Sequence, residues 1–201
     1  DYDHWAALGN EGWSFDEVLP YFIHSENNQR LGDAFHGQSG PLHVSDLVSD
    51  NPFQQHFVQA AREAGFPLND DFNGAEQEGL GVYQVTQYQG QRWTAAHAYL
   101  RPHLQQRRNL RVQTGCTVTR ILFENQRATG VEYLQNGQRK ILKARREVIL
   151  AAGAFQTPQL LQLSGIGDAA QLQAMGIPVQ QHLPGVGENL QDHLQVRLLV
   201  D

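Results

Sequence analysis

Apolar residues recur at helical spacing in the first third of the chain. The segment "PFQQHFVQAAREAG" (52–65) places Phe53, Phe57, Val58 and Ala61 on one face, with Asn51 before it and a glycine at its end. The segment "SFDEVLPYFIHSENN" (14–28) has the same period, and Ser14 with Glu17 forms a capping box. We therefore predict a helix over each segment.

From residue 109 the period changes to short alternating runs. Residues 109–146 hold β-branched runs separated by Asn, Gly and Gln, which predict a β-meander. Val148 to Ala152 is a continuous apolar run, typical of a strand buried on both faces of a parallel sheet. Two short helices are predicted after it, over 158–164 and 169–175, and a final strand over 194–201.

Composition narrows the class of protein. The 201 residues are 40% hydrophobic, enough for one sizeable core or two small ones. The net charge of −6 argues against a nucleic-acid partner, and no apolar run reaches transmembrane length. One cysteine, Cys116, and histidines without i,i+4 pairing predict neither an intrachain disulfide nor a metal site. The chain starts at Asp1 and its one methionine is Met175, so we expect an internal piece of a longer polypeptide.

A glycine pattern near the end of the chain imitates a nucleotide-binding loop. Residues 165–170 (GIGDAA) fit G-x-G-x-x-[GA], which binds pyrophosphate where it follows a strand and opens a helix. Here the pattern follows a predicted helix instead, so Gly165 is better interpreted as the left-handed residue that ends that helix. We expect Gly176 to end the next helix in the same way.

The turn before that helix has better ligand geometry. Ligands of open α/β sheets bind beyond the carboxyl ends of strands, and Gly153 follows the predicted strand directly. Thr157 and Pro158 fit the N-cap and first position of a helix whose positive end would point to the same place. A strand-turn-helix packed for structure alone is an equal alternative.

The stretch "GAFQTPQLLQLSGIG" (153–167) resembles the second signature of the glucose–methanol–choline (GMC) oxidoreductases at every specified position. The segments "HGQSGPLHVSD", "GQRWTAAHAYLRP" and "LPGVGENLQDH" follow in the family's order, so the resemblance covers the chain end to end. Within the family, the chain is similar to bacterial dehydrogenases of primary alcohols and of choline.

The resemblance implies a mixed α/β (α+β) fold in which part of a Rossmann-like FAD-binding domain is interleaved with part of an antiparallel-sheet substrate domain. Residues 1–105 would be lid-following and substrate-domain helices. Residues 106–165 would belong to the FAD-binding domain, as β-meander and parallel strand. Residues 166–201 would connect into the substrate-domain sheet.

The same resemblance implies an FAD-dependent oxidation of a primary, aliphatic alcohol to the aldehyde. The hydride goes to flavin N5 and the electrons to a quinone or similar acceptor. Choline is the alternative substrate, and a non-catalytic binding module that keeps the fold is the alternative of another class. The family's catalytic His lies outside this chain, so no residue here is named catalytic. The implied location is cytoplasmic, with peripheral attachment to the inner membrane as a variant.

Three positions are candidate cofactor contacts. Val118 matches the position whose main-chain groups reach the FAD adenine in the family, with an ordinary valine of the meander as the alternative. Ala152 and Gly153 would pass close to the adenosine half, with close strand–helix packing as the alternative. The 201 residues by themselves are expected to bind no FAD tightly.

Five further residues have weaker signals. We expect His193 to be a hydrogen-bonded structural residue and Trp93 to serve packing, whereas Arg92 suits an anion or a domain contact. Trp5 and Trp13 flank a Gly-containing turn and are predicted to be core aromatics. Ser164 lacks the surroundings of a hydrolase nucleophile.

Overall fold

A computed structural model describes residues 1–48 and 51–196. The chain divides into two compact units, residues 1–111 and residues 112–201. Both contain helices and sheets, so the predicted mixed α/β class is confirmed. The assignment of residues 1–105, 106–165 and 166–201 to particular domains stays a prediction.

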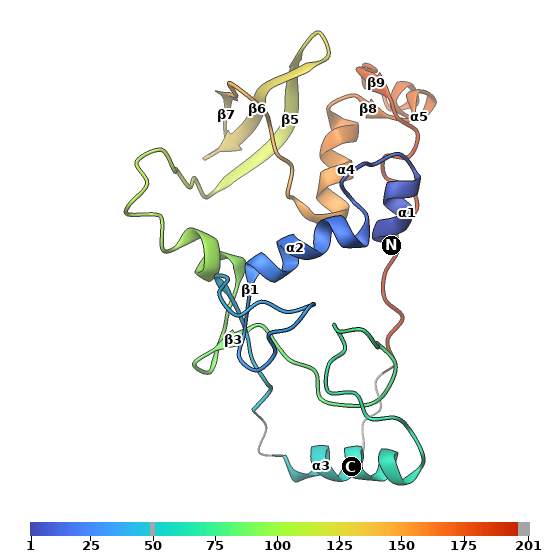
Figure 1. Ribbon diagram of the computed structural model, residues 1–201. Helices are drawn as coiled ribbons and strands as arrows, with labels where there is room; N and C mark the ends of the chain where they lie inside the picture. The colour runs from blue at the N-terminus through green and yellow to red at the C-terminus, as the bar shows by residue number, and fades with distance from the viewer. Residues whose placement is uncertain (49–50, 197–201) are drawn as a thin grey trace. The chain divides into compact units, whose positions relative to one another are not determined.

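The first unit contains the helices α1 (Tyr2–Ala7), α2 (Phe15–Ser25) and α3 (Pro52–Glu63) (Figure 1). The capping box that begins α2 is confirmed, because Ser14 N–H and Oγ both donate to the Glu17 carboxylate at 3.1 and 2.6 Å. These bonds lower the pKa of Glu17. Asn51 caps α3 by accepting from Phe53 N–H at 3.0 Å, as the sequence predicts.

Two small sheets complete the first unit. β1 (Glu26–Asn28) pairs in parallel with β2 (Leu42–Val44), and β3 (Gln87–Tyr88) forms a hairpin with β4 (Gln91–Arg92). A π-helical turn, η1 (Ala96–Leu100), follows the hairpin and ends just before Pro102. Pro102 has no backbone N–H to donate to the preceding turn, which gives the end of η1 a direct cause.

The second unit begins with an antiparallel meander in the order β5-β6-β7, which confirms the meander predicted from residue 109 onward. The strands are β5 (Cys116–Glu124), β6 (Arg127–Gln135) and β7 (Gln138–Lys143). Asn136 and Gly137 connect β6 to β7 with φ of 51° and 75°, the two left-handed positions that a tight hairpin needs.

Helix α4 (Gly153–Leu163) packs against β5 and is followed by β8 (Ile166–Gly167), α5 (Ala169–Ala174) and β9 (Gln181–His182). The core of this unit contains Ile121 of β5, Leu160 of α4 and Leu172 of α5, each at most 9% exposed. Gly165 and Gly176 have φ of 87° and 70°, which confirms that both are left-handed residues ending a helix.

The predicted buried strand over Val148 to Ala152 is wrong for this structure. Residues 147–151 have no regular secondary structure, and the Ile149 side chain is 79% exposed. A strand needs a hydrogen-bonded neighbour, and among the described residues no strand pairs with this run. The apolar sequence is therefore present without the sheet that would bury it.

The predicted helix start at Thr157 and Pro158 is also wrong. Helix α4 begins at Gly153, after Ala152, and Pro158 lies inside it. Thr157 still has a capping contact, because its Oγ1 accepts from Ala152 N–H at 3.2 Å. The final predicted strand starts in an irregular exposed segment at 194–196, and residues 197–201 lie outside the described part of the chain.

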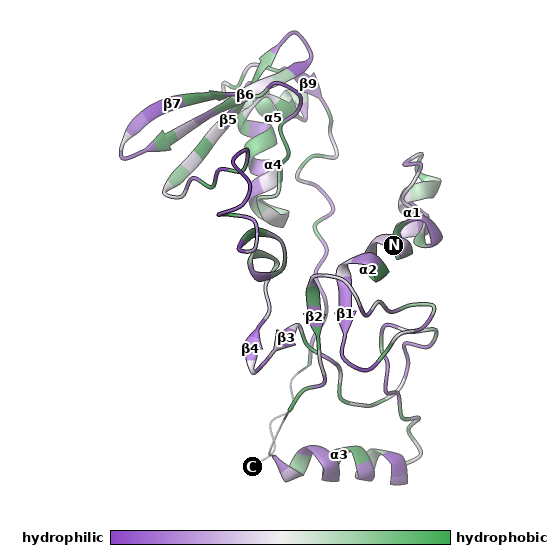
Figure 2. Cartoon of the chain, turned by 60° about the vertical axis from the view of Figure 1, so that its left-hand side comes forward, coloured by the Kyte–Doolittle hydropathy of each residue, from purple (hydrophilic) through white to green (hydrophobic). Residues whose placement is uncertain are grey.

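Hydropathy varies along most elements (Figure 2). Few large side chains are buried. The buried apolar residues of the described ranges are Val18, Ala61, Ala98, Ile121, Leu160 and Leu172. Within the same ranges, no helix combines the length and apolar character that crossing a membrane requires.

Candidate functional site

The free edge of β5 holds the first candidate position. Val118 faces Tyr133 of β6 in the antiparallel register, and its side chain is 41% exposed. Because β6 is the one strand beside β5 in the described chain, alternate N–H and C=O groups of β5 point away from the sheet. This edge can form hydrogen bonds with the rim of a flat polar ligand.

A register shift follows directly after Val118. Thr119 is the extra residue between Val118 and Arg120, and its Oγ1 donates to the Glu132 carbonyl at 3.2 Å and carboxylate at 2.8 Å. Such a bulge bends the strand and increases its twist. The hydrogen bonds of the Thr119 side chain thus stabilise the bulge beside Val118.

Ala152 and Gly153 lie at the start of α4, both exposed. Gly153 has φ of 88°, so it needs the left-handed conformation that glycine adopts without cost. A Cβ built on Gly153 would meet no heavy atom within 4 Å. Close strand–helix packing, the alternative explanation for this glycine, is therefore not seen, and open space lies beside it.

Ser164 connects the two elements on which the candidate positions lie. Its Oγ accepts from Ile121 N–H of β5 at 2.8 Å and donates to the Leu160 carbonyl of α4 at 2.6 Å. The structure thus packs α4 on β5, but it records no direct contact between Val118 and Gly153. Sequence reasoning missed this role for Ser164, because the pairing of a helix end with a strand 43 residues away leaves no local pattern.

In the first unit, a polar cluster surrounds a buried histidine. The His36 side chain is 3% exposed, with Nδ1 at 3.0 Å from Glu26 Oε2 and Nε2 at 3.1 Å from Asp71 Oδ2. Asn28, 2% exposed, donates from Nδ2 to Gln84 Oε1 at 2.7 Å and to Glu26 Oε1 at 2.9 Å. The cluster ties the loop around residue 71 to β1.

The two carboxylates set the charge of His36. Burial by itself lowers the pKa of the imidazole, but the hydrogen bonds and charges of Glu26 and Asp71 outweigh it and raise the pKa above its ordinary value. With both ring nitrogens facing carboxylates, the protonated form donates two hydrogen bonds. The arrangement suits a structural imidazolium, and we assign no substrate to it.

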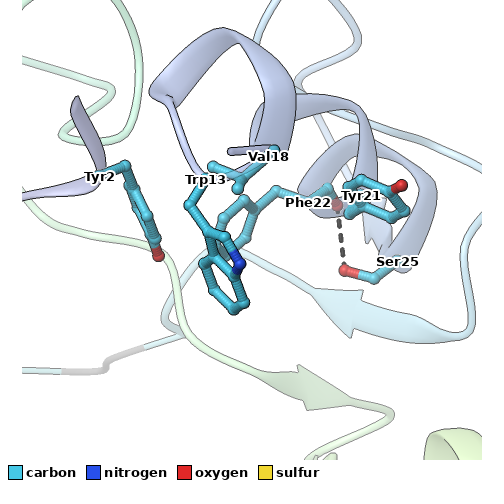
Figure 3. A pocket seen from close by; sticks show the side chains of 7 residues that line it. Tyr2, Trp13, Val18, Tyr21, Phe22 and Ser25 are labelled. Carbon is cyan, nitrogen blue, oxygen red and sulfur yellow. Dashed lines mark hydrogen bonds between the residues drawn. The ribbon is translucent and has the colours of Figure 1, made fainter. Parts of the chain in front are cut away.

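An open aromatic pocket lies on α2 in the first unit (Figure 3). Tyr2, Trp13, Tyr21 and Phe22 line it, and Ser25 Oγ donates to the Phe22 carbonyl at 3.0 Å. None of the three candidate cofactor residues belongs to this unit.

Trp5 and Trp13 belong to the same aromatic group, and their prediction as core residues is wrong. Their rings lie 5.8 Å apart, edge to face, yet the two side chains remain 44% and 51% exposed. A short helix and an open turn cannot surround two indole rings.

Of the three remaining candidates, Trp93 is a packing residue, whereas Arg92 and His193 are exposed. Trp93 serves packing, as predicted, because its Nε1 donates to the Pro41 carbonyl at 2.9 Å and its ring stacks on His97. Arg92 lies exposed on β4. His193 is exposed as well, and no side chain of the described residues bonds its ring, so its prediction as a hydrogen-bonded residue is wrong. No cluster of three metal-ligating side chains occurs in residues 1–48 and 51–196.

Comparison with known proteins gives one family over nearly the whole chain. The family model described as GMC oxidoreductase matches residues 1–195. Mitochondrial choline dehydrogenase of Mus musculus is 50% identical over 196 residues, which are 98% of this chain and 33% of that protein. Oxygen-dependent choline dehydrogenase of Sinorhizobium fredii is 47% identical over 97% of this chain and 35% of its own length.

Solved structures of flavin-dependent oxidoreductases and related oxidases superimpose on nearly the whole chain. Pyridoxine 4-oxidase from Mesorbium loti superimposes with a TM-score of 0.87 at 32% identity, over 96% of this chain and 38% of that one. An FAD-dependent oxidoreductase from Chaetomium thermophilum gives a TM-score of 0.86 at 34% identity, over 95% of this chain and 35% of its own. The chain thus spans about a third of the length of the relatives that it matches.

Proposed function

The chain belongs to the GMC oxidoreductase family, and on that premise we propose that it is part of an FAD-dependent dehydrogenase of a primary alcohol. The match of the family model to residues 1–195 carries the proposal. The activity, substrate and acceptor named below belong to the whole protein, of which this chain provides about a third by comparison with relatives.

The free edge of β5 and the start of α4 fit the adenosine half of FAD. The outer edge of β5, on which Val118 lies, offers main-chain donors and acceptors, which can pair with an adenine rim without help from the side chain. At Gly153 the absence of any atom within 4 Å of a built Cβ leaves room for a ligand beside the backbone. Val118, Ala152 and Gly153 are thus the residues that would hold the cofactor.

Bound FAD supplies the hydride acceptor for oxidation of an alcohol carbon. The contribution of this chain is to bind and orient, because β5 provides a rigid edge and Ser164 fixes α4 against it. No side chain of the described residues is proposed to move the hydroxyl proton. That step needs a general base, which we expect from another part of the protein.

Two substrates fit the proposal. The segments "DDFNG" (70–74) and "GQRW" (90–93) resemble those of aliphatic alcohol dehydrogenases of the family, whereas the relatives in mouse and Sinorhizobium fredii are choline dehydrogenases. At 50% and 47% identity these relatives give choline the stronger support. A quinone or similar compound is the proposed electron acceptor. The proposed location is the cytoplasm, with peripheral attachment to the inner membrane as a variant.

Turnover of the full-length protein tests the function. With a quinone dye as acceptor, we expect bound flavin and oxidation of choline faster than of a straight-chain primary alcohol. The reverse order would support the aliphatic substrate. A purified protein without flavin and without turnover on either would leave the non-catalytic binding module as the function.

Two variants of Val118 test the cofactor contact. Val118→Pro removes the main-chain N–H at this position and should lower the fraction of protein that holds FAD. Val118→Ala keeps the main chain and should leave FAD content unchanged. Circular dichroism checks that both variants fold, and equal FAD content in the two would contradict the main-chain contact.

A further inference from the structure

The segment that follows α3 closes on itself (Figure 1). Its two ends meet, because Asn69 N–H donates to the Leu80 carbonyl at 3.0 Å and Leu80 N–H donates to the Pro67 carbonyl at 2.9 Å. Inside the segment, Asn69 Nδ2 donates to the Glu76 carbonyl at 2.8 Å. We call residues 67–81 the closed loop. Compact loops whose ends lie together and whose own side chains pack them are Ω-loops, which are frequently functional.

Few hydrogen bonds join the closed loop to the rest of the first unit. Among the hydrogen bonds between described residues, those from outside the loop come from two side chains. His36 Nε2 lies 3.1 Å from both carboxylate oxygens of Asp71, and Arg30 Nη2 donates to a main-chain carbonyl, that of Asp70, at 3.0 Å. The Arg30 side chain is 41% exposed and that of His36 is 3% exposed. The contact with His36 is therefore the buried attachment of the loop.

This attachment needs a proton on both ring nitrogens of His36. Nδ1 lies 3.0 Å from Glu26 Oε2 of β1, and Nε2 lies 3.1 Å from Asp71 Oδ2 of the closed loop. These carboxylates are the charged groups that contact the ring among the described residues, and Asn28 Nδ2 is a neutral neighbour at 3.5 Å. A neutral imidazole has one N–H, so one carboxylate would then face a nitrogen lone pair. The imidazolium donates to both.

The two carboxylates differ in what else holds them. The Glu26 carboxylate also accepts from Gly37 N–H at 3.0 Å, outside the closed loop. The Asp71 carboxylate accepts from Asn73 N–H at 3.0 Å, which belongs to the loop itself. The Asp71 side chain is also the more exposed, at 24% against 17% for Glu26. When the ring loses a proton, Asp71 is thus the partner that can turn to water and take the loop with it.

We propose that the contact between His36 and Asp71 is a proton-controlled latch, in which the imidazolium holds the closed loop on β1 and the neutral ring releases it as one body. Release gives water access to the His36 ring. It also widens a cavity of about 660 Å³ that both the loop and α3 line, among other residues with Asp70 and Val58. The latch belongs to the first unit and goes beyond the proposed function.

The direction of the pH response follows from the same contacts. Burial lowers the pKa of His36, but the two carboxylates outweigh it and raise the pKa above the ordinary value of about 6.5. The latch is therefore complete below about pH 6.5, and it opens as pH rises through the higher pKa of the latched state.

Deuterium exchange at the C2–H of histidine, followed by mass spectrometry of the full-length protein, tests the latch. After correction for free imidazole, we expect exchange at His36 to be at least about tenfold faster at pH 9 than at pH 6, because a hydrogen bond to a charged group contributes about that much. The main-chain amides of Asn69 and Leu80 should exchange slowly at both pH values, since the loop moves as one body. A pH-independent rate at His36, or fast exchange of both amides, would overturn the inference.

Two variants at neighbouring positions separate the latch from a general effect of charge. Asp71→Ala removes the partner of Nε2 and should make exchange at His36 fast at pH 6 as well as at pH 9. Asp70→Ala is the matched control, because Asp70 is exposed and Arg30 bonds its main-chain carbonyl. It should keep the pH response of the wild type. Equal rates at His36 in the two variants would overturn the latch.

Asp71→Asn gives a second, sharper readout. Its amide oxygen can accept from the imidazolium and its amide nitrogen can donate to the neutral ring, so the rate at His36 should lose its pH step while the protein stays folded. A step of wild-type size in this variant contradicts the latch. FAD content and turnover of the same samples report separately on the proposed function, and their loss with an intact pH step would leave the latch standing.

Discussion

At the scale of single residues, His36 has the most closely surrounded titratable side chain, between Glu26 and Asp71. Each of the two carboxylates has a ring nitrogen of His36 as a polar partner. We expect His36→Gln to lower the free energy of unfolding by about 2–4 kcal/mol, because the substitution leaves polar groups without their partner. Urea unfolding measures this change.

The same residue gives a pH dependence of defined sign. The pKa of His36 is raised on folding, so its contribution to stability is fully present below the ordinary value of about 6.5. It is lost as pH rises through the higher pKa of the folded state. The stability gap between wild type and His36→Gln should therefore narrow above pH 6.5. Exposed His24 gives the control His24→Gln, and a gap that widens with pH would refute the assignment.

Substitutions at two left-handed glycines distinguish the cost of backbone strain from the cost of steric crowding. At Gly165, φ is 87° and a Cβ would overlap the carbonyl oxygen of Pro178. At Gly176, φ is 70° and a Cβ would meet nothing within 4 Å. We expect Gly176→Ala to cost about 1–2 kcal/mol and Gly165→Ala about 3 kcal/mol or more. Equal costs in thermal unfolding would show that the contact with Pro178 is unimportant.

At the scale of elements, Ser164 holds α4 on β5. Ser164→Ala leaves the N–H of buried Ile121 without an acceptor, so we expect a loss of about 1–3 kcal/mol in unfolding free energy. Ser25→Ala is the control, because its hydroxyl bonds within its own helix. If the two variants were equally stable, the bond between the elements would contribute nothing.

Sequence patterns predicted elements where the determinants are local. The meander follows from alternation and from Asn136-Gly137, and α3 from its Asn51 cap and helical period. The prediction of a buried strand over Val148 to Ala152 was wrong, because the burial of a strand depends on neighbouring strands from other parts of the sequence. The predicted start of α4 was wrong as well. Proline prefers the first position of a helix, but Pro158 is tolerated inside this one, so the true start lies earlier.

Of the candidate site, the sequence indicates positions on the main chain but not the contacts between distant segments. Val118 was proposed through a family resemblance, and Gly153 through its place after a predicted strand as well as that resemblance. Neither has a side-chain signal, because a main-chain edge and an open backbone leave little trace in sequence. The bond from Ser164 to Ile121 and the cluster around His36 depend on contacts between distant segments. Such contacts appear only in three dimensions.

At the scale of the whole molecule, exposed apolar surface is extensive. Phe53 and Phe57 on α3, Phe155 on α4 and Ile149 are each at least 59% exposed. We expect residues 1–201 expressed by themselves to bind a hydrophobic dye, to unfold over a broad temperature range and to hold no FAD. A yellow fragment with a sharp transition would refute this expectation.

The central claim is that this chain is part of an enzyme in which FAD takes hydride from a primary alcohol. Anaerobic mixing of the full-length protein with choline, followed by visible absorbance, measures that step without any electron acceptor. We expect a flavin spectrum that bleaches on addition of choline and returns with a quinone. A protein that holds flavin but keeps its oxidised spectrum with choline and with straight-chain alcohols would contradict it.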